Sequence, residues 1–591
     1  MTFQIPRLDA VVAQWRSFAR NDQVVLSALA LIIGAAVGYG TIGFRLLLGL
    51  IQEVFIGFSS HKVATLAAEL EWWHVLLAPA AGGLFVGLFL KYLTPGGNAE
   101  GVAQVIEAGS LRGGKLTLRR GLAVATVSAA SLGAGASAGR EGPVVHLGAT
   151  AASFVAQRFK FGPSLALTLL GCGVASAVAA SFNAPIAGVF FALEVVIGHY
   201  ALHAFAPIVI ASVAGTIVSR VHLGDFPAFV LPDYSITSLF ELPAFLLLGI
   251  LCSVVAMIFM WSIMFATDTV ERTPVPKWLR PAIGGLGVGL IAIFFPQVLG
   301  VGYEATDDAL KGLIPFGFLI LLVIAKVTAT AITLGSGFGG GVFSPSLYIG
   351  AMTGGAFGYV AASAFPELAS SPGLYAIVGM GAVAAPVLGA PISTVLMMFE
   401  LIGDFSVTVA AMIAIAVASI VTHQILGQSF FAWQLNRQGV SLKGGRARQI
   451  LLTVRARHIM GDDFRTIAEN SSISHIRHLL RTAPHDHFFV TDADGHYVGK
   501  ISFSDIRDVA FDTDVDTLIN ARDAARKVTV IEGDDNLERA LSIMDAAGEN
   551  HLPVVDNDRN RVVIGILHHN RALREYNKAL LSAHAEEHDE R

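Results

Sequence analysis

Gly133-Ala-Gly-Ala-Ser-Ala-Gly-Arg-Glu-Gly-Pro143 is a glycine-rich stretch between two apolar segments, and it carries one carboxylate, Glu141. Irregular backbone at membrane depth is tolerated only where it is buried in protein or lines a watery cavity. An ionisable side chain at such a place is a candidate functional site. The alternative is a polar loop at the membrane surface. The composition and organisation of the rest of the chain favour the first interpretation.

The chain has the composition of a membrane protein. Of its 591 residues, 54% are hydrophobic and 14% are charged, and the mean hydropathy is +0.62, whereas soluble domains carry about 25% charged residues. Its 61 glycines are spread through apolar sequence, which indicates close helix packing, because small residues let helix backbones approach in lipid. Cys172 and Cys252 both lie in apolar runs and predict neither a disulfide nor a metal site.

The distribution of basic residues predicts the orientation of the chain. The first 23 residues contain Arg7, Arg16 and Arg20 but no short apolar core with a small-residue cleavage site, so we expect a retained interfacial helix over 1–23. Further basic residues lie within 109–120 and beyond residue 436. By the positive-inside rule, both termini and the 109–120 loop face the cytoplasm. The prediction is a multi-pass protein of an inner or plasma membrane.

Several apolar segments are too short to cross a membrane as straight helices. A straight span needs about 20 residues, but 144–157, 185–198 and 391–402 are shorter and are divided from their neighbours by glycine and proline. This pattern predicts tilted or half-membrane helices that end inside the bilayer. The expected fold class is therefore an α-helical polytopic membrane protein with many tilted and broken helices.

Two pairs of motifs repeat along the chain in the same order. Residues 181–194 and 387–400 share Ala-Pro-Ile, a valine and a final glutamate in register. Residues 139–143 and 341–345 share a Gly-x-x-x-Pro frame, and the two pairs repeat at offsets of 206 and 202 residues. These nearly equal offsets predict a duplicated membrane part. The predicted halves are residues 24–225 and 235–435.

Duplicated halves with broken helices are typical of transport proteins, whose substrate site lies where half-helix ends meet. Moving a small anion into a low-dielectric interior costs about 20 kcal/mol in the Born limit. One helix N-terminus contributes about 0.3 to 2 kcal/mol, and one hydrogen bond to a charged group contributes about 1.5 to 3 kcal/mol. Several such groups must therefore converge. Glycine-rich breaks provide this convergence without a fixed lysine or arginine, which would hold the ion too tightly.

At these residues the sequence resembles the CLC family of chloride channels and chloride/proton antiporters, over residues 24–435. Gly139–Pro143 resembles the family's second signature, whose glutamate is the gate, and Lys326–Pro345 resembles its third, whose amides at Val342 and Phe343 would hold the anion. The resemblance implies an inverted-repeat fold and a homodimer with one pore in each subunit. It implies a gate at Glu141. The expected anion-site residues are Gly139, Arg140, Gly142, Gly341, Val342, Phe343, Phe431 and Glu100.

Two departures from the family pattern affect the anion site. Ala99–Ala103 aligns best with the first signature, which puts Glu100 where a serine hydroxyl usually touches the central anion. A carboxylate there would repel chloride. An alignment through Gly97-Asn98 keeps a donor but loses the Gly-Val that follows. Since Phe431 also replaces the expected pore tyrosine, chloride coordination is predicted to rest mainly on backbone amides.

A third departure concerns proton coupling. Val195 stands where antiporters of the family carry a proton-relaying glutamate, and valine cannot carry a proton. This favours channel-like conduction, although Glu100 or a water chain leaves the antiporter open. Glu194, echoed by Glu400, is interpreted as a structural carboxylate that meets backbone donors, because buried charges are usually paired. Lys326 is interpreted as a packing or counter-charge residue.

After a polar linker at 436–453 the composition becomes that of a soluble protein. Two similar units follow, each read as helix, strand, acidic turn, strand and helix. They resemble a tandem pair of CBS domains, which often bind adenine nucleotides. Ser502 and Asp505 match the ribose-contacting Ser/Thr-x-x-Asp, whereas His568 and Arg571 occupy those places in the second unit, so at most one nucleotide site is implied. A purely structural dimerisation module is the alternative. The predicted parts are CBS 1 at 454–511, CBS 2 at 512–575 and a tail at 576–591.

These expectations define one leading function. We expect gated transport of chloride or another small anion, with Glu141 as the gate and the CBS pair as a regulator. The alternatives are a chloride/proton antiporter and a membrane-anchored nucleotide sensor with little transport. No His-Glu-x-x-His motif is present, so we expect no enzyme activity. We expect no metal, no required cofactor and no nucleic-acid partner. Six histidines without metal-ligand spacing are expected at the surface: His485, His487, His568, His569, His584 and His588.

Overall fold

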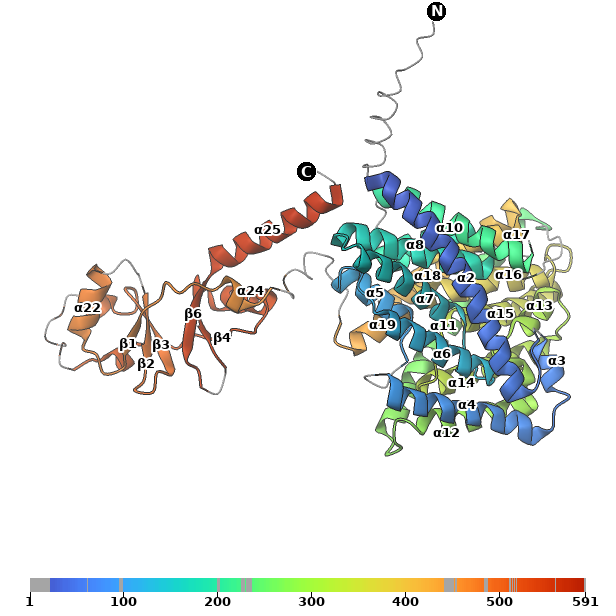
Figure 1. Ribbon diagram of the computed structural model, residues 1–591, viewed down its shortest axis with the longest axis horizontal. Helices are drawn as coiled ribbons and strands as arrows, with labels where there is room; N and C mark the ends of the chain where they lie inside the picture. The colour runs from blue at the N-terminus through green and yellow to red at the C-terminus, as the bar shows by residue number, and fades with distance from the viewer. Residues whose placement is uncertain are drawn as a thin grey trace, which may run out of the picture. The chain divides into compact units, whose positions relative to one another are not determined.

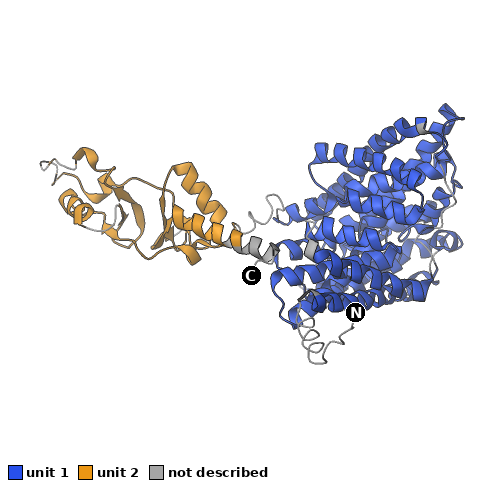
Figure 2. Cartoon of the chain, turned by 90° about the horizontal axis from the view of Figure 1, so that it is seen from above, with its two compact units in different colours: residues 1–441 blue, residues 442–591 orange. Residues whose placement is uncertain are grey.

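The computed structural model divides the chain into two compact units (Figure 2), unit 1 over Met1–Ser441 and unit 2 over Leu442–Arg591. The Gly97-Asn98 alternative lies outside the described residues. So do most of the expected interfacial helix at 1–23 and most of the linker at 436–453. The structure describes residues 22–60, 62–94, 99–198, 202–224, 229, 236–440, 451, 454–482, 487–509, 512, 514, 516, 518–557 and 560–588.

All the longer regular elements among the described residues of unit 1 are helices (Figure 1). The elements of its first half are α2 (Asp22–Ile56), α3 (Val63–Ala67), α4 (Trp72–Leu93), α5 (Val102–Leu111), α6 (Leu118–Gly133), α7 (Glu141–Arg158), α8 (Pro163–Phe182), α9 (Pro185–Phe191), the π-helix η1 (Ala192–Ile197) and α10 (Leu202–Leu223). Those of its second half are η2 (Leu239–Glu241), α11 (Leu242–Arg272), α12 (Arg280–Phe294), η3 (Pro296–Val298), α13 (Tyr303–Leu310), α14 (Phe316–Gly335), α15 (Phe343–Ala364), α16 (Pro372–Leu388), α17 (Pro391–Ile402), α18 (Phe405–Leu426) and α19 (Phe430–Arg437).

The helices vary widely in length, as the broken apolar pattern predicts. Seven helices among the described residues are long and apolar enough to cross a membrane, and five apolar helices have only 10–17 residues. Proline opens the short helices α9 and α17, where its fixed φ suits the first helical position and its missing N–H costs nothing. Asn183 and Gly389, both in the left-handed region, end α8 and α16 just before them.

The predicted duplication is visible in the helix breaks. α6 ends at Gly133 and α7 begins at Glu141, while α14 ends at Gly335 and α15 begins at Phe343, again 202 residues further on. The two breaks also bind one another reciprocally. The amide of Ser137 donates to Thr333 Oγ1 at 3.1 Å, and the amide of Gly339 donates to Ser131 Oγ at 3.0 Å. The helix before each break therefore provides an acceptor for a buried amide of the other break. The alternative of a polar surface loop is wrong, because residues 131–139 are all buried.

Glycines allow the close contact between α15 and α16. A Cβ built on Gly350 would lie 2.3 Å from the carbonyl oxygen of Gly379, and a Cβ on Gly379 would lie 2.5 Å from that of Gly350. Both distances are below any real Cβ contact, so each helix packs directly on the backbone of the other. Small residues serve this purpose in membrane helices because lipid gives no hydrophobic drive for association.

The Gly379→Ala variant is therefore expected to lose about 1 to 3 kcal/mol of stability, because two helix backbones must separate to admit a methyl group. Thermal unfolding of the purified protein in detergent measures the loss. Gly317→Ala is the matched control, since a Cβ on this α14 glycine meets nothing within 4 Å. Equal midpoints for the two variants would contradict the packing described.

Unit 2 contains two sheets of the same topology, β1-β2-β3 and β4-β5-β6, each with one parallel and one antiparallel pairing. The predicted order of helix, strand, turn, strand and helix is confirmed in the second motif, whereas in the first only the short 3-10 helix η4 follows β3. Each sheet also has a strand that was not predicted, β1 or β4. Residues 569–588, which include most of the predicted tail, form one helix. The elements are α21 (Ala456–Ile459), β1 (Thr466–Ala468), α22 (Ile473–Thr482), β2 (His487–Thr491), β3 (Tyr497–Ser502), η4 (Arg507–Val509), α23 (Ala521–Ala524), β4 (Ile531–Glu532), α24 (Leu537–Ala547), β5 (His551–Val555), β6 (Val563–His568) and α25 (His569–His588).

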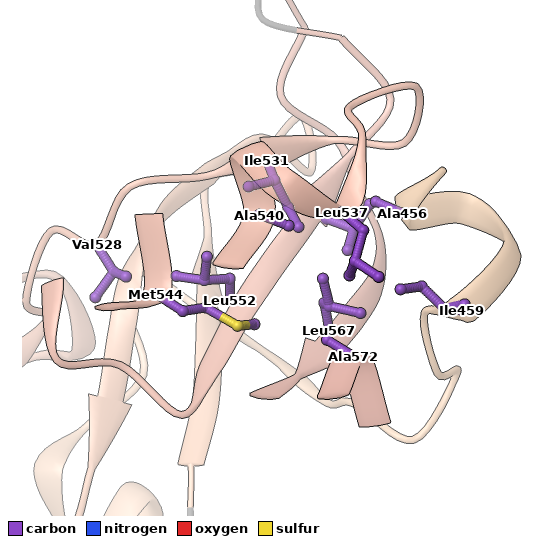
Figure 3. Packing of buried hydrophobic residues seen from close by; sticks show 11 residues of the cluster. Ala456, Ile459, Val528, Ile531, Leu537, Ala540, Met544, Leu552, Leu567 and Ala572 are labelled. Atoms are coloured by element: carbon purple, nitrogen blue, oxygen red, sulfur yellow. The ribbon is translucent and has the colours of Figure 1, made fainter. Parts of the chain in front are cut away.

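The two sheets exchange the segments that precede them. Figure 3 shows Ala456 and Ile459 of α21, which comes before the first sheet, in the same hydrophobic cluster as Leu537 and Leu567 of the second. Conversely, Ala521 of α23, which comes before the second sheet, lies in the core of the first. Each motif therefore completes its core with the leading segment of the other, which makes the pair a single folding unit. The boundary at 511/512 stays a prediction.

Candidate functional site

The two Gly-x-x-x-Pro frames lie side by side at the centre of unit 1. Gly139 and Gly341 form an antiparallel bridge, with the amide of Gly139 2.7 Å from the Gly341 oxygen and the amide of Gly341 2.8 Å from the Gly139 oxygen. The N-termini of α7 and α15 follow directly. Segments more than 200 residues apart are thus joined where two helix dipoles begin, which is the convergence an anion site requires.

Glu141 is the first residue of α7, and its side chain is fully buried. Its Oε1 accepts a hydrogen bond from the hydroxyl of Tyr303 at 2.6 Å, and its Oε2 accepts one from Ser344 Oγ. Arg140 lies 3.7 Å from Oε1 and stacks over the Tyr303 ring at 4.7 Å. A Cβ on Gly139 would lie 3.0 Å from Oε2, so this glycine leaves room for the carboxylate. The carboxylate is held by two hydroxyl donors, Tyr303 from α13 and Ser344 from α15.

Two cavities meet the chain next to Glu141. The larger, of about 840 Å³, is lined by Gly142 and by residues at the start of α5 and along α19. The smaller, of about 500 Å³, is lined by Arg140, Tyr303, the second half of α2 and the first residue of α3. Figure 1 shows α5 and α19 on one side of unit 1 and α3 and α13 on the other. The two chain neighbours of Glu141, Arg140 and Gly142, therefore line different cavities, and helices that line these cavities lie on different sides of the unit.

The predicted site residues fall into three groups. Gly139 and Glu141 form the buried centre, and Arg140 lines the smaller cavity. The remaining six line the larger cavity: Glu100, Gly142, Gly341, Val342, Phe343 and Phe431. The structure thus brings all nine into one region of unit 1. Their roles in anion binding and gating stay predictions.

Lys326 binds backbone, in accord with its interpretation as a packing residue. Its buried Nζ donates to the carbonyl oxygens of Val298 and Gly300, both at 3.0 Å, and lies 5.1 Å from the centre of the Tyr348 ring. These bonds fix the turn that leads to Tyr303. Lys326 therefore acts on the site indirectly, by positioning the segment that delivers the Tyr303 hydroxyl to Glu141.

Glu194 and Glu400 form a reciprocal clasp between the halves. Glu400 accepts hydrogen bonds from the amides of Ile186 and Ala187 at 2.8 and 2.7 Å, at the start of α9. Glu194 accepts hydrogen bonds from the amides of Ile392 and Ser393 at 3.0 and 2.8 Å, at the start of α17. Both are structural carboxylates on backbone donors, as predicted. Val195, next to Glu194, has no group that could carry a proton.

The nucleotide-site residues of unit 2 lie together at the end of β3. Asp505 Oδ2 accepts hydrogen bonds from the amide and hydroxyl of Ser502, at 2.8 and 2.6 Å, while its Oδ1 lies 3.2 Å from Arg526 Nε. In the second motif, His568 lies 3.3 Å from Asp463. The Ser502–Asp505 pair is therefore assembled, but a ribose would have to displace one of these donors.

The histidine prediction is wrong for His487. Its side chain is only 8% exposed, and its ring stacks on that of His551 with centroids 4.4 Å apart. His487 is the first residue of β2 and His551 is the first residue of β5, so the two motifs pair through these strand ends. The spacing of histidines along the sequence does not show this pairing.

A buried ion pair joins the two motifs of unit 2. Lys500 Nζ lies 2.8 Å from Glu549 Oε2, with both side chains less than 10% exposed, and Arg526 binds the other oxygen of Glu549. Burial alone would raise the pKa of Glu549, but the hydrogen bonds from Lys500 and Arg526 outweigh it, so the pKa lies below its ordinary value. The ionised carboxylate is thus the form that stabilises the fold.

The pair predicts acid sensitivity of unit 2. A lowered pKa contributes stability that is complete above the ordinary value, about 4.5, and is lost as the pH falls below it. Hydrogen–deuterium exchange on the full-length protein, corrected for intrinsic rates, should show β3 amides less protected at pH 4 than at pH 6.5. Glu549→Gln should remove most of this difference, whereas Glu538→Gln, on α24 and outside this ion pair, should keep it. Equal pH dependence in both variants would contradict the assignment.

Tyr303 and Ser344 are the functional residues that sequence reasoning missed. Ser344 lies inside the second Gly-x-x-x-Pro frame, and its position three residues after Gly341, matching Gly142 after Gly139, could have marked it. Tyr303 carries no such signal, because it follows an irregular turn at Gly300–Gly302 whose path depends on Lys326.

The fold and the site define a duplicated membrane protein whose broken helices end at a buried ionisable centre, which is the architecture of transport proteins. Residues 82–423 match the family model of the voltage gated chloride channel, and residues 456–512 and 521–578 match that of the CBS domain. The chain belongs to the voltage gated chloride channel (CLC) family and carries two CBS domains. The family and fold class predicted from the sequence are confirmed.

Known proteins of both transport types are similar to the chain. The H(+)/Cl(−) exchange transporter ClcA of Vibrio cholerae is 30% identical over 73% of this chain and 93% of its own length. Chloride channel protein CLC-f of Arabidopsis thaliana is 29% identical over 92% of this chain and 79% of its own. The solved structure of a slow cyanobacterial Cl−/H+ antiporter superposes with a TM-score of 0.64 at 24% identity, covering 70% of this chain and 97% of that one, and this likeness concerns the fold alone.

Proposed function

We propose that this protein carries chloride across the membrane along a path that joins the two cavities and that Glu141 closes. Glu141 supports this assignment because its carboxylate is fully buried while its chain neighbours Arg140 and Gly142 line different cavities. A path from one cavity to the other along α7 would run past this residue. Membership of the voltage gated chloride channel family, the duplicated fold and the paired N-termini of α7 and α15 all agree with such a path.

The hydrogen bonds of Glu141 suggest how the gate works. Its two oxygens occupy the place where the Tyr303 and Ser344 hydroxyls point, next to the N-termini of α7 and α15. A chloride ion in that place would be stabilised by the same donors, so carboxylate and anion compete for one position. Protonation removes the charge of Glu141 and its advantage over chloride, which opens the path.

Charged side chains around the larger cavity favour anion entry. Four basic residues line it, against the two carboxylates Glu100 and Glu271. A positive excess at a cavity mouth raises the local anion concentration and the rate of entry. Backbone amides at Val342 and Phe343 would then coordinate the ion. The four basic residues are Lys91, Lys277, Arg280 and Arg437.

Three further properties belong to the same proposal. The subunits form a homodimer with one path each, as the family resemblance implies. Both termini face the cytoplasm of an inner or plasma membrane, in keeping with the basic residues near them. The CBS pair regulates transport, with Ser502 and Asp505 as the place for an adenine nucleotide; the assembled pair supports a single site, and transport itself requires no cofactor.

Chloride efflux from proteoliposomes tests the proposed function. Purified full-length protein should release chloride far faster than protein-free vesicles once the electrical potential is shunted. Protein-free rates of chloride release would overturn the proposal, and nucleotide binding at Ser502 and Asp505 without flux would support the membrane-anchored sensor instead. Channel-like conduction is favoured by Val195, whereas proton-coupled exchange is favoured by the arrangement described next.

A further inference from the structure

Glu100 and His146 form a titratable pair beside the larger cavity. Glu100 precedes the first turn of α5, His146 lies on α7, and Glu100 Oε2 is 3.5 Å from His146 Nε2. The Glu100 side chain is 19% exposed and the His146 side chain is fully buried. One member thus faces the cavity, and the other extends the pair into the protein.

His146 is positioned to share a proton with Glu100. Neither of its ring nitrogens makes a hydrogen bond within the described residues, although both are buried. A buried imidazole without a hydrogen bond costs folding free energy. Such a group in a folded protein therefore calls for an explanation, and a functional role is one. The carboxylate of Glu100 lies within ion-pair distance of His146. A proton bound by either group is therefore stabilised by the other.

The pair is connected to Glu141 in two ways. His146 follows Glu141 by five residues on α7, which is about 7.5 Å along a helix axis. The larger cavity is lined by Glu100 and also by Gly142 and Val145, which lie between Glu141 and His146 on α7. A cavity of about 840 Å³ holds several water molecules, so water can extend from Glu100 to Gly142, the residue next to Glu141.

The surrounding charges bias the pair toward a carboxylate that can accept a proton. Arg120 of α6 lies 3.6 Å from Glu100 Oε1, and Arg112, itself paired with Glu107 of α5, also acts on it. Helices α8 and α15, which pack against α7, contain no acidic, basic or histidine residue. The charged groups of α2 nearest the path, Arg45 and Glu53, line the smaller cavity.

We propose that Glu100 and His146 form a proton-transfer site that exchanges protons between Glu141 and the solution filling the larger cavity. The inference rests on the proposed transport function and adds proton coupling to it. A proton leaves the Glu141 carboxyl group, which becomes a carboxylate, passes through cavity water and is taken up by the Glu100–His146 pair, in which the carboxylate and the imidazole hold it together. The protonated pair releases the proton to the solution at the cavity mouth.

Simultaneous recording of chloride and proton flux in proteoliposomes tests this. An outward chloride gradient should drive protons uphill through the wild-type protein. Glu100→Gln and His146→Gln should each lower the ratio of proton to chloride flux by about tenfold or more, because the site needs both of its members to hold the proton. The double variant should be no worse than either single one, since both residues serve one site.

Glu271→Gln is the matched control, because Glu271 lines the same cavity but is 57% exposed and bound to Arg437. Its flux ratio should equal that of the wild type, and chloride flux through each variant confirms that the variant is folded. Unchanged ratios in Glu100→Gln and His146→Gln would overturn the inference. Chloride flux without uphill protons in the wild type would also overturn it while leaving the proposed function intact, whereas absence of chloride flux would overturn both.

Discussion

Replacing Glu141 by glutamine is expected to give chloride flux that no longer changes with pH. Glutamine has nearly the same shape but no charge, so it cannot compete with an anion for the Tyr303 and Ser344 hydroxyls. In the wild type, protonation removes the charge of Glu141 and with it this competition. The wild-type flux should therefore rise on acidification, and the variant should be fast at every pH.

The measurement is chloride efflux from proteoliposomes between pH 4.5 and 7.5. Glu53→Gln is the matched control, because Glu53 also lines the smaller cavity but is exposed. It should keep the pH dependence of the wild type. If Glu141→Gln retained that dependence, another group would control the path and the gate assignment would be wrong.

Removing the Glu400 carboxylate is expected to have the largest effect on stability. In Glu400→Ala, the amides of Ile186 and Ala187 lose their acceptor at the start of α9. Each hydrogen bond to a charged group is worth about 1.5 to 3 kcal/mol, so the loss should be at least about 3 kcal/mol. Glu400→Gln keeps one acceptor oxygen and should lie between the wild type and Glu400→Ala.

The thermal midpoint of purified protein in detergent, followed by size-exclusion chromatography, measures this loss. Glu194→Ala should give a comparable loss, since Glu194 holds α17 in the same way from the other half. Glu367→Ala is the control, because Glu367 lies in an exposed segment after α15. A Glu400→Ala midpoint equal to that of Glu367→Ala would show that the clasp does not hold the halves together.

Much of the fold could be predicted because its signals are local or repeated. The breaks before Glu141 and Phe343 contain glycine and proline, and their equal spacing in two halves predicts the duplication. The buried position of Glu141 follows from one carboxylate in a glycine-rich stretch of a strongly apolar chain. The interpretation of Glu194 follows from its echo in Glu400, although nothing in one motif says that each glutamate binds the other motif.

The missed features depend on contacts between distant segments. Tyr303 reaches Glu141 only because Lys326 holds the preceding turn. Glu100 is visible in the sequence as a departure from a family motif, but its pairing with His146 requires α5 and α7 to pack together. The exchange of leading segments between the CBS motifs is likewise hidden, because apolar spacing shows that a segment is buried and does not show against which sheet.

Anomalous diffraction from crystals grown in bromide would test the central claim most directly, since it locates the halide itself. We expect bromide within hydrogen-bonding distance of the Val342 and Phe343 amides in the wild type. In Glu141→Gln, we expect a further bromide peak at the Tyr303 and Ser344 hydroxyls, where the carboxylate of Glu141 otherwise lies. Bromide bound only outside the two cavities, with none near residues 139–143 or 341–345 in either protein, would contradict the account.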